Sequence, residues 1–481
     1  MPRMTRPAAS PKVIPIAPVA ADAGSGRLYE SSRKIYPRNV QGRFTRWRWA
    51  MVFATQLFFY LMPWLQWGGR QILLFDLAAR RFYIFGLVLY PQDLIYLSGL
   101  LVLSALSLFL FTAVAGRLWC GFACPQTVYT EIFMWVEQKI EGNRIARMRL
   151  DGEAFSAEKL VKKWFKHVVW LGIAMWTGFT FVGYFTPIRE LGLAFLQTRM
   201  GSWEVFWVFF YGLATYGNAG FMREQVCKYM CPYARFQSAM FDADTLIVSY
   251  DAARGEPRGV HAKGQDARAL GLGDCIDCGL CVQVCPVGID IRQGLQYECI
   301  GCGLCVDACN TVMDRMAQPH GLIRYATENG MKKGWTAAQV LRRVLRPRVL
   351  VYGFVLLALA IGLLASLVVR MPLKVDVVRD RGSLARLVEG GRLENVYRLQ
   401  IMNATERPQV YRIAAEGGLQ GLAVASDDRV KVDAAQSRWV AVRLQIPADR
   451  APVGSHTVYF DVRTADGSAH VSEKAVFLVP R

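Results

Sequence analysis

Five long apolar stretches dominate the first three quarters of the chain. A helix needs about 20 consecutive apolar residues to cross the hydrocarbon core of a bilayer, and each stretch has roughly that length. They predict a multi-domain membrane protein with a five-helix α-helical transmembrane bundle. The stretches are Trp47–Trp67, Leu94–Val114, Val168–Pro187, Trp203–Phe221 and Val349–Val369.

Two shorter apolar patterns predict elements of another kind. Phe82–Tyr90 has only nine residues, too few to span a bilayer, and indicates an interfacial or re-entrant piece. Pro125–Ile140 carries apolar residues at helical spacing, which predicts an amphipathic helix. This helix lies along the inner membrane face or packs on the cysteine-rich region that follows in the chain.

Beyond Arg370 the pattern changes to short runs in which apolar and polar residues alternate. A period of two is typical of strands with one buried face. Roughly 110 residues of such strands, separated by Asn, Gly, Asp and Pro, predict an immunoglobulin-like β-sandwich. The clearest runs are Val396–Ile401, Val410–Ile413, Trp439–Ile446 and Thr457–Val462.

Basic residues alternate in number from one loop to the next. Seven Lys or Arg residues lie between Arg27 and Arg48, before the first stretch, and the following loop holds only three. Cytoplasmic loops of membrane proteins carry the excess of basic residues. The N-terminus is therefore predicted to be cytoplasmic and the C-terminal domain periplasmic. This bias explains the net charge of +19, so the charge does not indicate nucleic-acid binding.

Composition and charge together predict the order of domains. A content of 53% hydrophobic residues and a mean hydropathy of +0.21 agree with a membrane protein. The predicted parts are a disordered basic cytoplasmic tail (1–46), a four-helix transmembrane region (47–222) with a cytoplasmic loop (115–167), a cytoplasmic ferredoxin-like domain (223–345), a fifth transmembrane helix (349–369) and a periplasmic immunoglobulin-like β-domain (371–481).

Eight of the twelve cysteines form two runs with the spacing C-x-x-C-x-x-C-x-x-x-C. A two-cluster bacterial ferredoxin has this spacing, in which the fourth cysteine of each run binds the other cluster. Structural zinc sites also contain C-x-x-C, but they do not need the doubled pattern. We therefore predict two [4Fe-4S] clusters. One is assigned to Cys275, Cys278, Cys281 and Cys309, and the other to Cys299, Cys302, Cys305 and Cys285.

The other four cysteines form two C-x-x-x-C-P pairs, Cys120 with Cys124 and Cys227 with Cys231. Proline suits the first turn of a helix, so each second cysteine is predicted to begin one. Amide dipoles at a helix start lower a thiol's pKa, which makes Cys124 and Cys231 the expected reactive thiols. Together the four sulfurs form a candidate Cu(I) site, because soft ligands favour Cu(I). The alternative is that they only pack helix ends, as small hydrophobes.

The combined motifs resemble those of the FixG, RdxA and CcoG family, which is accessory to assembly of the cbb-type cytochrome c oxidase. The likeness rests on Trp119–Gln126, Cys227–Pro232, the eight-cysteine insert, the fifth helix and the outer β-domain. It implies a multi-pass protein of the bacterial inner membrane that reduces Cu(II) to Cu(I) for copper delivery. Implied partners are membrane lipid, oxidase assembly factors or a copper transporter or chaperone, a cytoplasmic electron donor and a second copy of the chain.

Two other functions fit the same motifs. Membrane subunits of the NapH type also combine four helices, C-x-x-x-C-P pairs and an eight-cysteine ferredoxin, and they resemble quinol-linked electron conduits. A third reading is a non-enzymatic scaffold for oxidase assembly, whose clusters act as a redox sensor or as structural staples.

Overall fold

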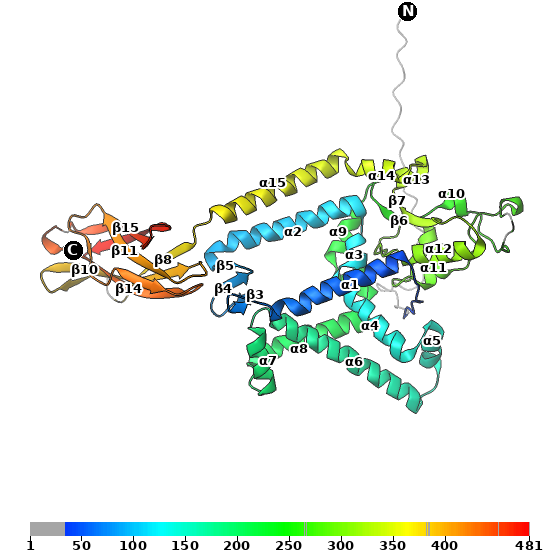
Figure 1. Cartoon of the computed structure of the whole chain (residues 1–481), viewed down its shortest axis with the longest axis horizontal. Coiled ribbons are helices and arrows are strands. Elements are labelled where there is room, and N and C mark those ends of the chain that lie inside the picture. The colour runs from blue at the N-terminus through cyan, green and yellow to red at the C-terminus, as the bar shows by residue number, and fades with distance from the viewer. Residues whose placement is uncertain are drawn as a thin grey trace, which may run out of the picture. The chain divides into compact units, whose positions relative to one another are not determined.

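The computed structural model describes residues 34–263, 265, 267–380, 382, 385–450 and 452–480 (Figure 1). Most of the predicted disordered tail, residues 1–46, lies outside the described residues. All five predicted apolar stretches fall on helices. These are α1 (Arg43–Leu61), α2 (Leu94–Ala115), α6 (Ala157–Val182), α8 (Ser202–Gly217) and α15 (Pro347–Val369).

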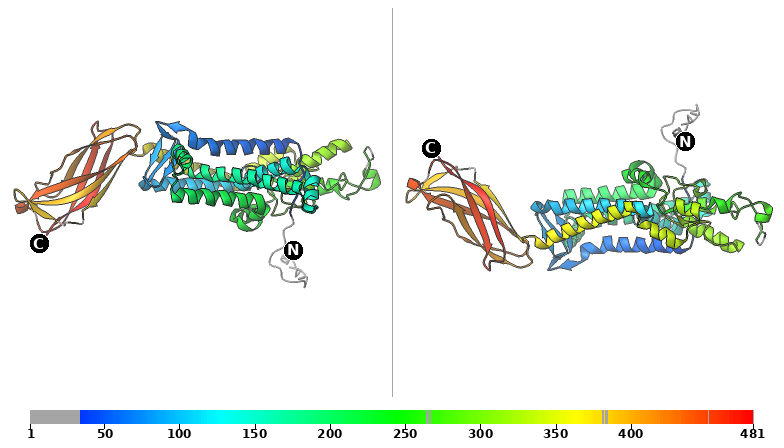
Figure 2. Two further views of the ribbon diagram at one scale, coloured as in Figure 1. Left: turned by 90° about the horizontal axis from the view of Figure 1, so that it is seen from below. Right: turned by 90° about the horizontal axis from the view of Figure 1, so that it is seen from above.

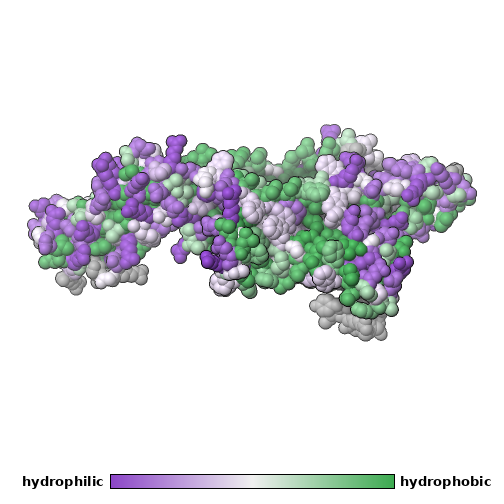
Figure 3. Space-filling model, turned by 60° about the horizontal axis from the view of Figure 1, so that its bottom comes forward, coloured by the Kyte–Doolittle hydropathy of each residue, from purple (hydrophilic) through white to green (hydrophobic). Residues whose placement is uncertain are grey.

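Three of these helices have the length and composition of a membrane span. Among the described residues they are Pro91–Ala115, Ala157–Val182 and Pro347–Val369, where the first includes the turn before α2. Apolar side chains gather over the helical region on the face seen in Figure 3. The protein is therefore membrane-associated, while five spans and their sidedness remain predictions.

Several predicted helix ends are wrong, and the two largest differences are at the end of α1 and the start of α6. The helix expected to reach Trp67 ends at Leu61, and Gln66–Trp67 forms strand β1 instead. Pro63 follows the end of α1, and proline lacks the N–H that a continued helix needs. The helix expected to begin at Val168 begins at Ala157, because the Ser156 side chain accepts a hydrogen bond from the Lys159 amide and caps it there.

Shorter helices connect and flank these five. They are α3 (Leu118–Phe122), α4 (Pro125–Glu141), α5 (Arg144–Gly152), α7 (Ile188–Leu196), α9 (Pro232–Met240), α10 (Ala252–Gly255), α11 (Leu280–Gln283), α12 (Leu304–Met316), α13 (Glu328–Lys333) and α14 (Ala337–Val344), together with π-helical turns at Asn218–Met222 and Val226–Met230. The amphipathic helix predicted over Pro125–Ile140 is confirmed as α4.

Close helix packing depends on glycine. Helix α6 packs on α8, where a Cβ built at Gly178 lies 2.3 Å from the backbone oxygen of Val208. Helix α15 runs beside α2 (Figures 1 and 2) and brings Leu363 against Gly99. Small residues of this kind let membrane helices approach closely.

The short apolar piece Phe82–Tyr90 forms strands. It belongs to an antiparallel sheet of β3 (Leu73–Asp76), β4 (Arg81–Ile84) and β5 (Leu87–Leu89). Phe85, at the turn between β4 and β5, has a positive φ of 54°. A two-residue hairpin, β1 with β2 (Arg70–Gln71), precedes this sheet.

A buried network of ion pairs joins α4, α5, α6 and the chain after α8. Glu137 Oε2 lies 3.3 Å from Arg147 Nη1 and 2.9 Å from Arg223 Nη2. Glu141 Oε1 lies 2.8 Å from Lys166 Nζ. Both carboxylates are buried. Because breaking a buried pair leaves an uncompensated charge, this network holds the four segments in one arrangement.

The ferredoxin-like insert contacts α1 and α2. Asp307 on α12 accepts hydrogen bonds from the backbone amides of Phe44 (3.2 Å) and Thr45 (2.8 Å), at the first turn of α1. The Ala113 carbonyl near the end of α2 accepts hydrogen bonds from Thr245 Oγ1 (3.2 Å), inside the insert, and from Arg346 Nη2 (2.6 Å), directly after it. Within the insert, β6 (Ile247–Tyr250) pairs antiparallel with β7 (Ile323–Ala326) beside α11 and α12.

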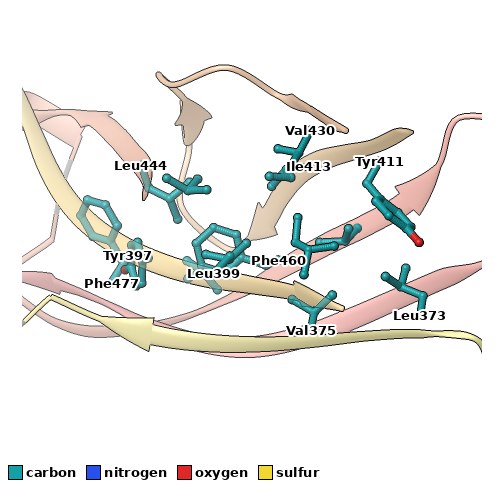
Figure 4. Close-up of a cluster of buried hydrophobic side chains, with 14 of the residues drawn as sticks. Leu373, Val375, Tyr397, Leu399, Tyr411, Ile413, Val430, Leu444, Phe460 and Phe477 are labelled. Carbon is teal, nitrogen blue, oxygen red and sulfur yellow. The ribbon is translucent and has the colours of Figure 1, made fainter. Parts of the chain in front are cut away.

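The C-terminal domain is a sandwich of two antiparallel sheets, and each predicted strand run falls inside an observed strand. Its core side chains point between the sheets (Figure 4). One sheet has the order β12-β14-β10-β8, with β9 also paired to β10, and the other has the order β13-β11-β15-β16. The strands are β8 (Leu373–Arg379), β9 (Arg386–Val388), β10 (Arg392–Asn403), β11 (Gln409–Gly417), β12 (Ala423–Val424), β13 (Arg429–Val432), β14 (Ser437–Pro447), β15 (Gly454–Thr464) and β16 (His470–Val479).

Replacing Glu137 by Leu is expected to destabilise the protein by about 3–5 kcal/mol, because removal of the carboxylate leaves buried cations unpaired. The measurement is thermal unfolding of the detergent-solubilised protein. Glu158→Leu is the control, since Glu158 pairs with Lys162 on the surface of α6 with a side chain that is 72% exposed, and it should change the melting temperature little. Equal losses in the two variants would contradict a stabilising role for the network.

Candidate iron-sulfur and paired-cysteine site

The eight cysteines of the two runs line two small cavities inside the insert. Four of them surround what we call the first cysteine cavity, and four others, joined by Cys281, surround the second cysteine cavity. The lining cysteines of the first cavity are Cys275, Cys278, Cys281 and Cys309, and those of the second are Cys281, Cys285, Cys299, Cys302 and Cys305. In each cavity the fourth cysteine of one run meets the first three of the other run.

Glycines turn the chain around these cavities. Gly279, Gly301 and Gly303 have φ values of 64°, 63° and 73°, and the last two flank Cys302. L-residues with a Cβ rarely adopt this conformation. The loops can therefore direct several sulfurs and amides toward one centre.

The donor sets fit clusters better than single ions. Among the described residues, no three His, Cys, Asp or Glu side chains lie close enough together to hold one metal ion. Thiolates around a cluster stand farther apart, because iron and sulfide atoms lie between them. Burial raises the pKa of the Cys281 thiol to about 11 and that of Cys285 to about 12. Cationic iron would compensate these thiolates.

Tyr250 adds a second sign that the first cysteine cavity suits a cluster. Tyr250 lines that cavity, and its hydroxyl is buried beside Cys275. Burial, followed by the neighbouring Cys275, raises the hydroxyl's pKa, so it stays a donor. A sulfur ligand of a bound cluster would accept that hydrogen bond. The sequence carries no signal that singles out this tyrosine.

The two cysteine pairs occupy matching positions. Cys124 precedes α4 and Cys231 precedes α9, each in an extended conformation with proline as the first helical residue. The prediction that each second cysteine begins a helix is confirmed. Cys120 lies on α3, and Cys227 lies in the second π-helical turn.

The expected low pKa of Cys124 is wrong. Burial raises the pKa of this thiol, and the amides of Thr127 and Gln126 at the start of α4 oppose that effect only in part. Burial likewise raises the pKa of Cys120 to about 12 and that of Cys227 to about 11, and neighbouring thiolates raise both further. A helix start lowers a thiol's pKa only where the sulfur remains solvated or faces a cation.

The pairs lie next to each other and next to the second cysteine cavity. Cys231 raises the pKa of Cys124, and both of these cysteines raise that of Cys227. The pKa of Cys120 is raised by Cys124 and Cys227. Cys120 packs among the apolar residues around Cys302. A small cavity beside Cys227 is lined by Pro286, Val287 and Ile300 of the insert.

Gly121 on α3 lies directly against the backbone of the insert. A Cβ built on Gly121 lies 2.8 Å from the Cα of Cys302, 2.8 Å from the oxygen of Ile300 and 2.9 Å from that of Gly301. Backbone atoms cannot withdraw as a flexible side chain can. Only glycine therefore lets the residue after Cys120 touch the loop that carries Cys302.

Arg117 is the side chain at this site that sequence reasoning missed. It lies between α2 and α3, is buried, and donates hydrogen bonds to the backbone oxygens of Tyr297 and Ala234. The first oxygen precedes Cys299, and the second belongs to the helix that follows Cys231. The sequence carried no signal for it, because basic residues are common in a predicted cytoplasmic loop that follows a membrane span.

Three family models match the chain. A 4Fe-4S dicluster domain matches residues 222–328, which include both cysteine runs and the second pair. A 4Fe-4S binding domain matches residues 97–143, which include the first pair. The IG-like fold at the C-terminal of FixG matches residues 363–480. These matches identify two iron-sulfur regions and an immunoglobulin-like domain.

Relatives match over most of the chain. It is 37% identical to the nitrogen fixation protein FixG of Rhizobium meliloti (strain 1021), with 92% of each chain covered. It is 39% identical to protein RdxA of Cereibacter sphaeroides, over 81% of this chain and 84% of that protein. A crystal structure of a FixG-related protein from Vibrio parahaemolyticus covers 22% of this chain and 95% of its own length. Its 21% identity and TM-score of 0.21 are too low to support a conclusion.

Replacing Gly121 by Ala is expected to displace the loop that carries Cys302, because the new methyl group would overlap backbone atoms. Anaerobically purified protein should lose iron and EPR signal from the second cysteine cavity, while the first cavity keeps its own. Gly172→Ala on α6 is the control, since no atom lies within 4 Å of a Cβ built there. Full iron content and unchanged melting of Gly121→Ala would contradict the steric argument.

Proposed function

The chain belongs to the FixG/RdxA family, and from this premise we propose that it reduces Cu(II) to Cu(I) during assembly of a cbb-type cytochrome oxidase. The family and the 4Fe-4S domains make it an iron-sulfur redox protein. The copper chemistry, the oxidase and the residues that act are parts of the proposal.

The proposal assigns one [4Fe-4S] cluster to each cysteine cavity. Cys275, Cys278, Cys281 and Cys309 would hold the first centre, and Cys285, Cys299, Cys302 and Cys305 the second. This assignment is supported by the exchange of the fourth cysteine between runs, which two-cluster ferredoxins share, and by the lining of the two cavities. When bound, such clusters supply one-electron redox chemistry.

The single observation that carries the proposal is the contact of Gly121 with the loop around Cys302. It brings the first cysteine pair against the second cysteine cavity with no side chain between the two backbones. Redox centres exchange electrons efficiently only when they lie close together, so a substrate at the paired cysteines would be near an electron source.

The paired cysteines suit copper as the substrate of this site. Cys120, Cys124, Cys227 and Cys231 offer soft sulfur ligands, which favour Cu(I) over Cu(II). The balanced step is the uptake of one electron by each Cu(II), with the loss of one electron from the reduced protein. A cytoplasmic one-electron donor must then restore that electron. The same thiols are the residues to which a copper transporter or chaperone would present the ion.

The proposal puts the protein in a bacterial inner membrane as a multi-pass protein, with the iron-sulfur insert in the cytoplasm and the β-domain in the periplasm. Three helices of spanning length and the unequal distribution of basic residues between loops support this arrangement. Membrane lipid, oxidase assembly factors and a second copy of the chain are the proposed partners.

A second candidate function is a quinol-linked electron conduit of the NapH type. The observation in its favour is a cavity of about 550 Å³ between α6, α8 and the turn after β3, walled by rings that include Phe181, Trp207 and Tyr211. Asp76 and Glu204 also line it. The volume is typical of small-molecule sites, and carboxylates could accept the protons that a quinol releases on oxidation.

The test is to replace Cys124 and Cys231 by Ser. Wild-type protein, reduced under anaerobic conditions and mixed with Cu(II), is expected to form Cu(I) as the cluster absorbance recovers. The double variant should keep both EPR signals and lose most of this reaction, because two of the four soft ligands are gone. A chelator that is specific for Cu(I) measures the product.

The control for this test is Cys124→Ser alone, which should reduce copper at an intermediate rate. Full cupric reduction by the double variant with intact clusters would contradict the proposal. Clusters that stay reduced with copper but are reoxidised by a quinone analogue would favour the quinol-linked function.

A further inference from the structure

We propose that Arg117 is a positioning residue whose buried positive charge raises the reduction potential of the centre in the second cysteine cavity, beside the paired cysteines. This inference rests on the proposed cluster assignment, and it identifies the residue that would make the second centre the better electron acceptor of the two. It does not require that copper is the final substrate.

The first observation is that Arg117 is a buried cation with no acidic partner among the described residues. The residue is only 5% exposed. Its two terminal nitrogens donate to backbone oxygens of Tyr297 and Ala234, and its Nε has no hydrogen-bond partner in the described part of the chain. A buried charge that is not paired costs several kcal/mol, so the folded protein needs an anion near this guanidinium.

The second observation is which groups surround it. Burial lowers the pKa of Arg117, and the charges of four thiols, Cys120, Cys299, Cys227 and Cys231, raise it in that order of effect. One of these thiols lines the second cysteine cavity, and the other three belong to the pairs. A cluster held by four thiolates is a net anion, so it would supply the missing counter-charge.

The third observation is that two other cations near the cavities, Arg292 and Arg48, are paired with carboxylates. Arg292 lines the first cysteine cavity, but it pairs with both Asp290 and Asp277. Arg48 influences the charge of Cys302, but it pairs with Glu131 at 2.9 Å. Arg117 has no such pair among the described residues, so its charge acts on the second cavity without a neutralising carboxylate.

The consequence follows from electrostatics. Reduction adds a negative charge to a centre that is already anionic, and a fixed nearby cation stabilises the reduced form more than the oxidised form. Net charge and hydrogen bonding around the sulfurs are the means by which proteins set cluster potentials. Arg117 would thus hold the electron at the second centre, which adjoins Cys120.

The test is a redox titration of the full-length protein in detergent, followed by EPR, without copper. Arg117→Gln is expected to shift the one-electron equilibrium of the second centre at least tenfold toward the oxidised form, which equals a potential 59 mV lower. The one-electron equilibrium of the first centre should change by less than twofold. Arg117→Lys keeps the charge and should stay within twofold of wild type.

Tyr250→Phe is the matched control, because Tyr250 is among the residues that line the first cysteine cavity and is not among those that line the second. This variant should change the reduction potential of the first centre alone. The EPR signal whose potential changes is thereby assigned to the first centre, and the other signal to the second. Arg117→Gln protein with both centres loaded and both equilibria within twofold of wild type would overturn the proposal.

If the Arg117→Gln protein does not bind a cluster in the second cysteine cavity, its potential cannot be measured. The Arg117→Lys protein then tests the proposal. A loaded lysine variant with an unchanged potential supports the role of charge. Failure of the lysine variant to load shows that the two carbonyl contacts matter and the charge does not, and this overturns the proposal. Because copper is absent throughout, a failed cupric reductase assay leaves this result intact.

Discussion

The backbone contact between Gly121 and the loop around Cys302 is the constraint on which the arrangement of the cysteines depends. It requires a residue without a Cβ directly after Cys120, and it requires α3 to follow α2 after a turn of only two residues. Since the insert covers that turn, Arg117 is buried with it. This steric requirement therefore places the Cys120 thiol and the Arg117 guanidinium beside the second cysteine cavity. Neither side chain could turn to solvent unless the backbones of α3 and the insert moved apart.

The protein treats buried charge in two different ways. Around α4, acidic and basic side chains neutralise one another, and this network fixes the helix that begins after Cys124. Around Arg117 there is no carboxylate partner within the described residues, and only backbone oxygens and thiols face the charge. The first arrangement stabilises the fold without any metal. The second becomes favourable when anionic sulfur stands beside it, so it belongs to the site and not to the scaffold.

Sequence reasoning predicted the elements that depend on local patterns and missed those that depend on distant contacts. Period-two alternation was sufficient for the strands of the sandwich, and proline spacing was sufficient for the helix starts at Cys124 and Cys231. The early start of α6 was not predicted, because Ser156 and the polar first turn of the helix lie before the apolar stretch on which the prediction was based. Arg117 and Tyr250 were not predicted, because their roles depend on residues more than 20 positions away in the chain. Arg117 contacts Tyr297, and Tyr250 lies near Cys275.

The thiol of Cys124 shows why a local rule can fail at a buried site. A helix start stabilises a negative charge by about 0.3–1 kcal/mol at an exposed position, whereas one pKa unit corresponds to 1.36 kcal/mol. Burial of a thiol can cost several such units, so the amides of Gln126 and Thr127 lower the pKa without restoring its ordinary value. The raised pKa favours the protonated thiol at Cys120, Cys124 and Cys227, and a metal ion bound at these sulfurs would displace the protons, because metal binding and thiol deprotonation are coupled. The helix starts fix the positions of Cys124 and Cys231, and in the proposed function the charge of an arriving metal, assisted by Arg117, would convert the thiols to thiolates.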